Sequence, residues 1–418
     1  MVFSVSHLVT FANMSIINNI SPKQIIGCFL YIGRNRILRK EVKMNSIFEE
    51  ISILRKGAPL IIDNKNSNRY RIVVVEPDGT KTAYYFAAPI YNFRTKKAVD
   101  MKFNLKGDVA YATGSNSNIT ISNNILMENS EGSCVISLSD RISHISEKEV
   151  LCRNERICLT TNGVSIRRNC VEGKPFTFTI EISKPFLEVR ANDKCFALMS
   201  ERFRPFIAIS CIGTTDSNGN IISPASISYQ KTFDRKYTFT VSPCSSLGKS
   251  VVIEANLYES KLFQDTTVES KNAKANNAFG SVGFIGTTKE FGEQWLYSRP
   301  DYSKMHELND KKIQRAILHI PKLNNVAVEL SASKVATRFC SFGSTWDNKV
   351  AEASSLTDSQ ITDHYFDLNL MPFLTDKQGR LSRGEGFILK SKKKGIGFSV
   401  IATGDNCFAP QILEINYR

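Results

Sequence analysis

The chain has 418 residues, of which 42% are hydrophobic and 22% are charged, and its formal net charge at pH 7 is +14. This length suits two or three domains with proper cores, and the composition excludes an intrinsically disordered chain. No apolar run approaches the length of about 20 residues that a membrane-spanning helix needs. The positive charge is spread along the sequence, which indicates a basic surface and not a concentrated nucleic-acid-binding arm.

Residues 1–43 differ from the rest because they hold six Lys or Arg against Glu41 alone. Their apolar runs are interrupted by Asn, Pro and Lys, and no small-residue cleavage site follows, so no classical export signal is visible. Codons for residues 40–42 can spell AAG GAG GTG, a bacterial ribosome-binding sequence, at a suitable spacing before Met44. We predict that residues 1–43 are a mis-assigned or disordered extension and that the native chain starts at Met44; the alternative is a coincidence of codon degeneracy.

The first elements after Met44 are a helix and a hairpin. Four apolar residues at helical spacing predict a short amphipathic helix, namely Ile47, Phe48, Ile51 and Leu54. The strand-like runs YRIVVV and KTAYYFAAPIYN flank a Pro-Asp-Gly turn, so the segment from Tyr70 to Asn92 is predicted to be a β-hairpin.

Many short β-rich runs follow, separated by Asn, Gly, Ser and Pro. They read VDMKFNL, SCVISL, PFTFTIEI, PFLEV, PFIAIS and KYTFTV. Within PFTFTIEI the large apolar residues from Phe176 to Ile182 alternate and so fall on one face of a strand. This pattern predicts an all-β protein of two or more antiparallel β-sandwich domains. Residues 44–249 would form the N-terminal sandwich region, as one domain or as two that divide near residues 143–153.

The last part of the chain, from Tyr365 to Tyr417, contains three more strand-like runs. They read YFDLNLMPFL, EGFILKSKKKGIGFSVIAT and APQILEINY. In the middle run a lysine and glycine turn lies between two apolar stretches, Phe387 to Leu389 and Phe398 to Val400, and predicts a second β-hairpin. The final run predicts a terminal strand that pairs inside a sheet and closes its sandwich.

These C-terminal runs resemble a known family. In order, the sequence has a Trp followed by an Asn, then YFDLNLMPFL, GEGFILK, a Gly and Phe strand and APQILEINY. This order resembles the DNRLRE-type domain, a bacterial surface and spore module that also occurs in phage and cell-wall-associated proteins. Upstream, LFQDTTVESKNAKANNAFGSVGFIG is similar to the opening strand, Asn-rich turn and small-residue strand of that family. The resemblance covers roughly residues 254–418. It implies that residues 250–418 form a jelly-roll-like β-sandwich that folds by itself and serves attachment, not catalysis. Members usually carry an export signal, which is not visible in this sequence.

Motifs for catalysis and metal binding are not found in the sequence. It has no HExxH, no GxSxG and no Rossmann fingerprint, so no enzyme and no cofactor are predicted. The ten cysteines contain no CxxC pair, and the nearest couple, Cys152 and Cys158, has no histidine beside it. We expect buried free thiols and no metal ion.

Three polar residues and two histidines have simpler structural interpretations. Asp216, Asn218 and Asn220 alternate as calcium ligands do, but a hairpin turn accounts for them with fewer assumptions. His319 lies in the apolar run RAILHI and His364 precedes YFDL, so both are expected at strand edges or in a core.

Two features could bind a ligand, and the first is aromatic. Trp295 and Tyr297 in QWLYS, with Trp346 in STWDNK, could stack on sugar rings, and Asp347 and Asn348 could contact the hydroxyl groups. The alternative is that these aromatic residues belong to a sandwich core.

The second feature is a run of lysines at the predicted hairpin turn. Lys390, Lys392, Lys393 and Lys394 could contact an anionic polymer such as teichoic acid or nucleic acid. The alternative is a solvated hairpin tip whose charges suppress strand aggregation.

Together these observations predict a non-catalytic structural or adhesive protein, associated with a phage tail or another particle. Its partners would be a surface polysaccharide or wall polymer and other particle proteins or copies of itself, with nucleic acid not expected. The alternative is a polysaccharide-binding protein of the bacterial cell surface or spore, released by a non-classical route. A polysaccharide-degrading enzyme is the third hypothesis, and it requires paired carboxylates that face a cleft.

Overall fold

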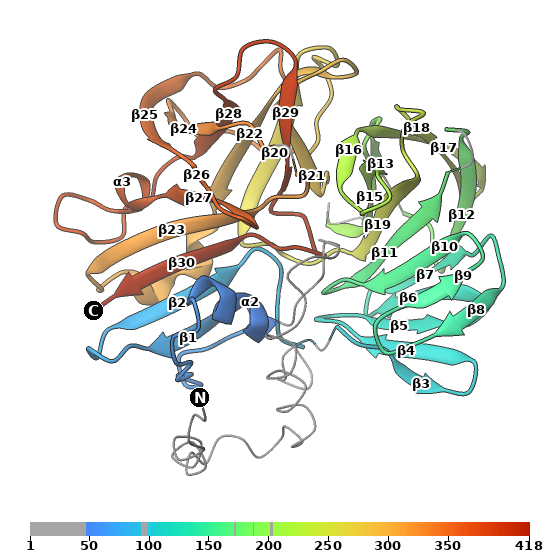
Figure 1. The fold of residues 1–418 in the computed structure, drawn as a ribbon, viewed down its shortest axis with the longest axis horizontal. Helices are drawn as coiled ribbons and strands as arrows, with labels where there is room; N and C mark the ends of the chain where they lie inside the picture. Colours follow the sequence, from blue (N-terminus) through green and yellow to red (C-terminus); the bar gives the residue numbers. More distant parts are fainter. Residues whose placement is uncertain are drawn as a thin grey trace, which may run out of the picture. The chain divides into compact units, whose positions relative to one another are not determined.

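The computed structural model describes residues 47–92, 99, 101–170, 173–186, 188–200, 204–325 and 327–418. Within them the chain consists mainly of antiparallel β-strands, which form four sheets (Figure 1). One hydrophobic core joins a nine-stranded to an eight-stranded sheet, and a second core joins a six-stranded to a seven-stranded sheet. The predicted all-β fold of antiparallel β-sandwiches is therefore confirmed. The predictions about residues 1–43 and Met44 lie outside the described residues.

The first sandwich uses the middle of the chain. The strands of its nine-stranded sheet are β8 (Ile142–Ile145), β9 (Val150–Cys152), β10 (Glu155–Leu159), β11 (Gly163–Asn169), β13 (Glu188–Ala191), β14 (Cys195–Met199), β15 (Pro205–Thr215), β16 (Ile221–Ser223) and β19 (Ser250–Leu257). They pair in the order β13-β14-β15-β19-β11-β10-β9-β8, with β16 also on β15.

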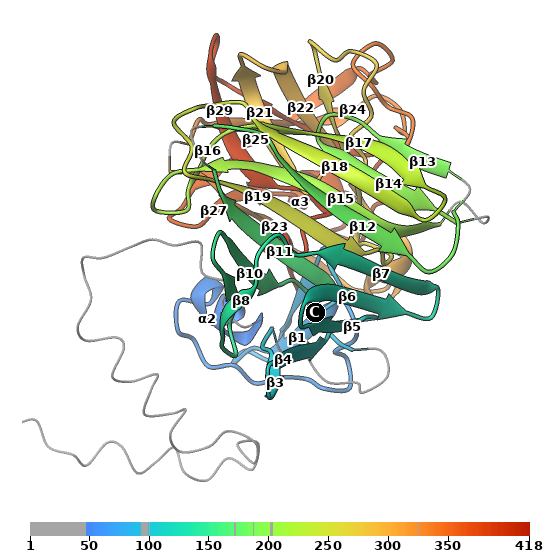
Figure 2. The ribbon, with the colours of Figure 1, turned by 90° about the vertical axis from the view of Figure 1, so that its right-hand side faces the viewer.

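The strands of the facing eight-stranded sheet are β3 (Asn104–Lys106), β4 (Val109–Thr113), β5 (Asn118–Ile121), β6 (Asn124–Asn129), β7 (Gly132–Ser137), β12 (Phe176–Ile182), β17 (Ala225–Phe233) and β18 (Lys236–Pro243). They pair in the order β17-β18-β12-β7-β6-β5-β4-β3, and Figure 2 shows β17, β18 and β12 side by side. Phe178, Ile180 and Ile182 of β12 all point into the core, as the alternation predicts.

The second sandwich uses both ends of the chain. The strands of its six-stranded sheet are β1 (Arg71–Val75), β2 (Lys81–Phe86), β23 (Ile313–Pro321), β26 (Gln360–Ile361), β27 (Tyr365–Asn369) and β30 (Ile412–Tyr417), in the order β1-β2-β30-β23-β27-β26. The strands of the seven-stranded sheet are β20 (Phe263–Glu269), β21 (Val282–Thr288), β22 (Gly292–Pro300), β24 (Leu330–Val335), β25 (Glu352–Asp358), β28 (Phe387–Ser391) and β29 (Gly397–Ala402). Two short 3-10 helices, η2 (Tyr302–Lys304) and η3 (His306–Leu308), follow β22.

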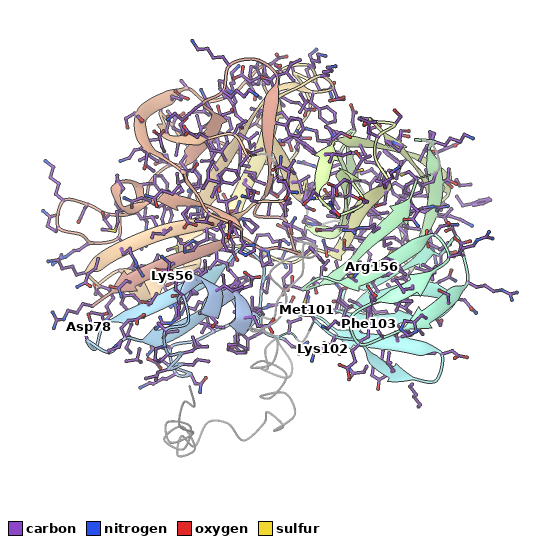
Figure 3. The ribbon with its side chains drawn as sticks, in the orientation of Figure 1. Lys56, Asp78, Met101, Lys102, Phe103 and Arg156 are labelled. Carbon is purple, nitrogen blue, oxygen red and sulfur yellow. The ribbon has the colours of Figure 1, made fainter. Side chains whose placement is uncertain are left out.

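The predicted N-terminal hairpin and the predicted terminal strand pair with each other. β1 and β2 are antiparallel across a turn in which Gly79 N donates to Glu76 O at 2.9 Å, and Asp78 lies at the tip (Figure 3). β2 then pairs with β30 along the whole strand, and β30 pairs on its other side with β23. The terminal strand therefore lies inside a sheet, as predicted.

The sheets do not follow the predicted division of the chain at residues 249 and 250. β1 and β2 precede that point but belong to the second sandwich, whereas β19 follows it but pairs with β11 and β15 of the first. The cause is physical: hydrophobic alternation specifies which face of a strand is buried but not which strand lies at its edge.

The predicted N-terminal helix forms and covers the outer face of the six-stranded sheet (Figure 1). α2 (Ile47–Leu54) buries Ile47 and Ile51, whereas Phe48 is 36% exposed. Beneath the helix lie Tyr84 and other apolar residues of β1, β2 and β30. The sheet thus has apolar groups on both faces.

The two sandwiches contact each other through smaller clusters. One apolar cluster joins Ile212 and Ile221 to β21 and β29, and another joins β14 to Phe279. A buried ion pair links Lys194, just before β14, to Glu269 of β20. The junction is therefore packed with both apolar and charged groups.

Two local predictions for the C-terminal region are wrong. β28 pairs with β22 and β24, whereas β29 pairs with β21, so the lysine-rich connection between them does not close a β-hairpin. The run YFDLNLMPFL is not one strand: β27 ends at Asn369 and a short helix, α3 (Met371–Leu374), follows with Pro372 in its first turn. Proline lacks an N–H donor, so it suits a helix start better than a sheet interior.

Other local predictions agree with the structure. Asp216 accepts hydrogen bonds from the backbone N atoms of Asn218 and Asn220 at 2.8 and 2.9 Å, which makes a turn between β15 and β16.

No helix in the described part of the chain is long and apolar enough to cross a membrane.

Candidate functional site: a tryptophan and lysine cluster beside a groove

The predicted aromatic residues lie on the outer face of the seven-stranded sheet. In β22, Leu296 points into the core, so its neighbours Trp295 and Tyr297 point outward. In β28, Ile388 and Lys390 point outward for the same reason. The segment between β24 and β25 folds over this face and contributes Trp346.

Two indole rings and two lysines meet at the edge of this covered face, and we call them the Trp–Lys cluster: Trp295, Trp346, Lys349 and Lys390. The indole centroids are 4.8 Å apart with their planes tilted by 52°. Lys349 Nζ is 4.0 Å from the Trp346 centroid, and Lys390 Nζ is 3.4 Å from the Trp295 centroid. These are cation–π contacts at partly exposed rings, so the cluster combines apolar surface with positive charge.

Polar partners fix the orientation of the cluster. Trp295 Nε1 donates to Glu293 Oε1 at 2.8 Å, and Lys349 Nζ donates to Trp346 O at 3.1 Å. Lys390 also forms an ion pair with Glu352 of β25. The indole edges, the lysine ammonium groups and two carboxylates are therefore held together at one place on the surface.

Tyr297 is not available to a ligand, which corrects the prediction that it contacts sugar. Its side chain is completely buried, and its hydroxyl donates to Val350 O at 2.7 Å. Burial raises the pKa of Tyr297 above its ordinary value. Tyr297 instead packs with Phe339 beneath the covering segment.

Asn348 and Asp347 have different positions although they are adjacent. Asn348 Oδ1 accepts from Thr345 N at 2.7 Å, and its Nδ2 donates to Gly343 O at 3.0 Å, so this side chain holds the loop in shape. Asp347 is exposed and lines an open groove of about 440 Å³. The other groove residues are Asp193, Asn272, Ala273, Lys274 and Ala275.

The four predicted lysines do not form one patch. Lys390 is directed to Trp295 and Glu352, and Lys392 pairs with Asp358 at 2.9 Å and with Glu329 at 3.2 Å. Hydrogen bonds to these two carboxylates raise the pKa of Lys392. Lys393 and Lys394 are exposed, and no carboxylate of the described residues lies within ion-pair distance of either.

Several residues at this site were not predicted, namely Lys349, Glu293, Glu352, Asp193, Asn272 and Lys274. Lys349 lies three residues after Trp346, and Glu293 lies two residues before Trp295, so proximity in sequence was a usable signal for these two. The groove residues come from distant segments and had no such signal.

His319 is buried in β23, as expected for a core histidine. Its Nδ1 is 2.7 Å from Asp367 Oδ1, and its Nε2 is 3.3 Å from Glu414 Oε2. Burial by itself lowers the pKa of His319, but the hydrogen bonds to Asp367 and Glu414 raise it overall. These groups lie in the sheet and not in a cleft, and no cluster of three or more metal-binding side chains occurs in the part of the chain that the structure describes.

Comparison of the chain with protein-family models and with curated proteins finds no match in either case.

Proposed function

We propose that the protein is a non-catalytic adhesive protein that binds a surface polysaccharide or wall polymer, as part of a phage tail or another particle. The observation that carries this proposal is the Trp–Lys cluster beside the groove lined by Asp347. The two indoles offer flat apolar faces to sugar rings. Carboxylates along the groove can accept hydrogen bonds from hydroxyl groups, and amides can donate to them.

The lysines suggest that the polymer carries negative charge. Lys349 and Lys390 cover parts of the two indoles. An anionic group on the ligand can attract these ammonium groups away from the indole rings. The ring faces that become uncovered can then contact the sugar. A wall polymer with phosphate or carboxylate groups, such as teichoic acid, has both features.

The resemblance of residues 254–418 to the DNRLRE-type domain supports attachment over catalysis. The same site also suits the alternative, a polysaccharide-binding protein of the bacterial cell surface or spore. The partner's identity separates the two: assembly with tail proteins favours the first, and retention on the producing cell favours the second.

The test is Trp346→Ala, measured by binding to purified wall teichoic acid and to a neutral wall polysaccharide. Loss of one stacking contact of about 1.5 kcal/mol weakens binding by about tenfold. Because Trp346 is only partly buried, the melting temperature should change little. A large loss of stability, of about 3 to 5 kcal/mol as for a core Trp, would contradict the site assignment.

Phe233→Ala is the matched control. Phe233 is an aromatic residue with 69% of its surface exposed, at the end of β17 in the first sandwich. Its removal should leave binding to both polymers unchanged. Equal weakening by both variants would show that any exposed aromatic residue matters and that the Trp–Lys cluster has no special role.

Cleavage of either polymer by the wild-type protein would overturn the non-catalytic function. The third hypothesis, a polysaccharide-degrading enzyme, would then need a pair of carboxylates that a polymer can reach. Asp193 and Asp347 line the open groove and would be the first to substitute in that case.

A further inference from the structure

A lysine and a cysteine contact each other at the junction between the sandwiches. Lys261 follows β19, Cys407 lies between β29 and β30, and Lys261 Nζ is 2.8 Å from Cys407 Sγ. Only 1% of Cys407 is exposed, and its carbonyl accepts a hydrogen bond from Thr161 N of the first sandwich at 3.0 Å. The contact therefore joins the connection between the sandwiches to the loop that leads into the terminal strand.

This distance is short for a hydrogen bond to sulfur. Sulfur is larger than oxygen, so an N–H···S contact normally holds its heavy atoms farther apart than the about 2.9 Å of an N–H···O bond. A single oxygen atom bonded to both the nitrogen and the sulfur would hold them close together, because two short single bonds would meet at a bent oxygen. The geometry thus suits a covalent bridge through one oxygen atom.

A small cavity adjoins Lys261. Lys261, Asp405, Tyr258 and Ser210 are among the residues that line a small cavity of about 10 Å³, which has room for roughly one water-sized molecule. Dioxygen is a small, uncharged oxidant, so it suits a space as confined as this cavity. A charged oxidant would have to lose its hydration to enter.

A base is also present beside the pair. Burial lowers the pKa of Lys261, but the neighbouring Cys407 and Asp405 raise it overall, so the amine begins as an ammonium group. Burial raises the pKa of Asp405 to about 6, which leaves it mostly ionised at neutral pH. A nitrogen bonded to oxygen is much less basic than a lysine amine, so the Asp405 carboxylate, which lines the same cavity as Lys261, can take up the proton as the N–O bond forms.

We propose that Lys261 and Cys407 are a modification site at which dioxygen forms a covalent N–O–S bridge. The lysine ammonium, the thiol and one dioxygen molecule give the bridge, one water molecule and one proton, which Asp405 accepts. One N–H bond and the S–H bond are replaced by N–O and O–S bonds, and the ammonium releases its extra proton. Nitrogen and sulfur each lose two electrons, and dioxygen accepts all four. Reduction by a thiol reverses the modification, so the bridge forms outside a reducing cytoplasm.

Cys407 is distinguished by the lysine that contacts its sulfur atom. The sulfur atoms of Cys170 and Cys195 instead donate to oxygen atoms, at Arg168 O and Asn192 Oδ1. Cys340 is exposed and Cys134 is buried in the first core, so these two residues report on general oxidation of accessible and inaccessible thiols. The bridge would link the segments on either side of the junction without any disulfide.

The experiment compares intact masses of the full-length protein kept under nitrogen with a thiol reductant and of the same protein exposed to dioxygen after the reductant is removed. The expected change is a gain of one oxygen and a loss of two hydrogens. Proteolysis should yield a peptide containing Lys261 joined to the peptide containing Cys407, and dithiothreitol should separate them. No mass change, or whole oxygen atoms gained without loss of hydrogen, would overturn the proposal.

Variants locate the modification. Lys261→Met and Cys407→Ala should each abolish the mass change, whereas Cys340→Ser should keep it. Persistence of the same change in Lys261→Met would also overturn the proposal. If either junction variant fails to fold, the linked peptide from the wild-type protein still decides the question, because it identifies both residues directly. The inference does not depend on the proposed carbohydrate binding.

Discussion

Glu254 is a buried acid whose environment makes stability depend on pH. It lies on β19 at the junction of the sandwiches with only 2% of its surface exposed, and Asn256 Nδ2 donates to its carboxyl group at 3.2 Å. Burial raises the pKa of Glu254 from its ordinary 4.5 to about 7, although the hydrogen bond from Asn256 acts in the opposite direction. Below about pH 7 the folded protein therefore holds the Glu254 side chain mainly as the neutral acid.

We predict that Glu254→Gln stabilises the protein at about pH 8 but not at about pH 5. Because the folded pKa is raised, the wild-type contribution to stability is fully present below pH 4.5 and is lost as pH rises through about 7. Glutamine resembles the neutral acid and does not ionise, so the gain at the higher pH is on the order of 2 to 3 kcal/mol. Urea unfolding at both pH values measures it.

Glu131→Gln is the control for this prediction, because 63% of the Glu131 side chain is exposed. It should shift the unfolding midpoint little at either pH. If Glu254→Gln has the same effect on stability at both pH values, the neutral acid is not the favoured form and the prediction is wrong.

At the scale of single residues, the sequence predicts which residue types form the cluster better than it predicts how deeply each side chain is buried. The sequence predicts Trp295 and Trp346 as parts of one site, and the structure brings their rings into contact. Tyr297, two residues after Trp295 on the same face of β22, is also aromatic, but it is completely buried beneath the covering segment. Depth under a loop depends on how the chain folds over a sheet, which local pattern does not encode.

At the scale of elements, α2 offers a direct comparison between two apolar residues. Ile51 is completely buried against the six-stranded sheet, whereas Phe48 on the same helix is 36% exposed. We predict that Ile51→Ala lowers the free energy of unfolding by about 2 to 5 kcal/mol, because it removes core packing. Phe48→Ala should cost much less although it removes a larger side chain. Denaturant titration of both variants measures the difference, and equal losses would mean that α2 does not pack through the Ile51 face.

Elements were predicted well where their signal was local. The Pro-Asp-Gly turn fixed the β1–β2 hairpin, and helical spacing fixed α2, because each pattern is contained within a few residues. The partners of the strands were not predicted. β28 and β29 adjoin a turn-like segment, yet each pairs elsewhere, because several strands expose edges of equal hydrogen-bonding capacity.

At the scale of the whole molecule, the pairing of β2 with β30 changes which fragment should fold alone. The sequence alone predicts that residues 250–418 are an independent domain. In the structure this fragment lacks β1, β2 and α2, so one edge of β30 and the outer face of its sheet would be uncovered. The fragment would also carry β19 without its partners β11 and β15. An unpaired edge and an exposed apolar face favour aggregation over folding.

We therefore predict that residues 250–418 alone do not unfold cooperatively, whereas a chain joining residues 47–90 to residues 259–418 through a short Gly and Ser linker does. The linker has little distance to span, because Leu262 N donates to Ala87 O at 2.9 Å and Tyr70 OH donates to Ser260 O at 2.8 Å. The joined chain restores the β2–β30 pairing and the cover of α2, so it should show a β-rich spectrum and a single melting transition. Circular dichroism with thermal denaturation compares the two fragments. Cooperative melting of residues 250–418 at the same temperature as the joined chain would show that the hairpin is peripheral, and the second sandwich would then be complete without it.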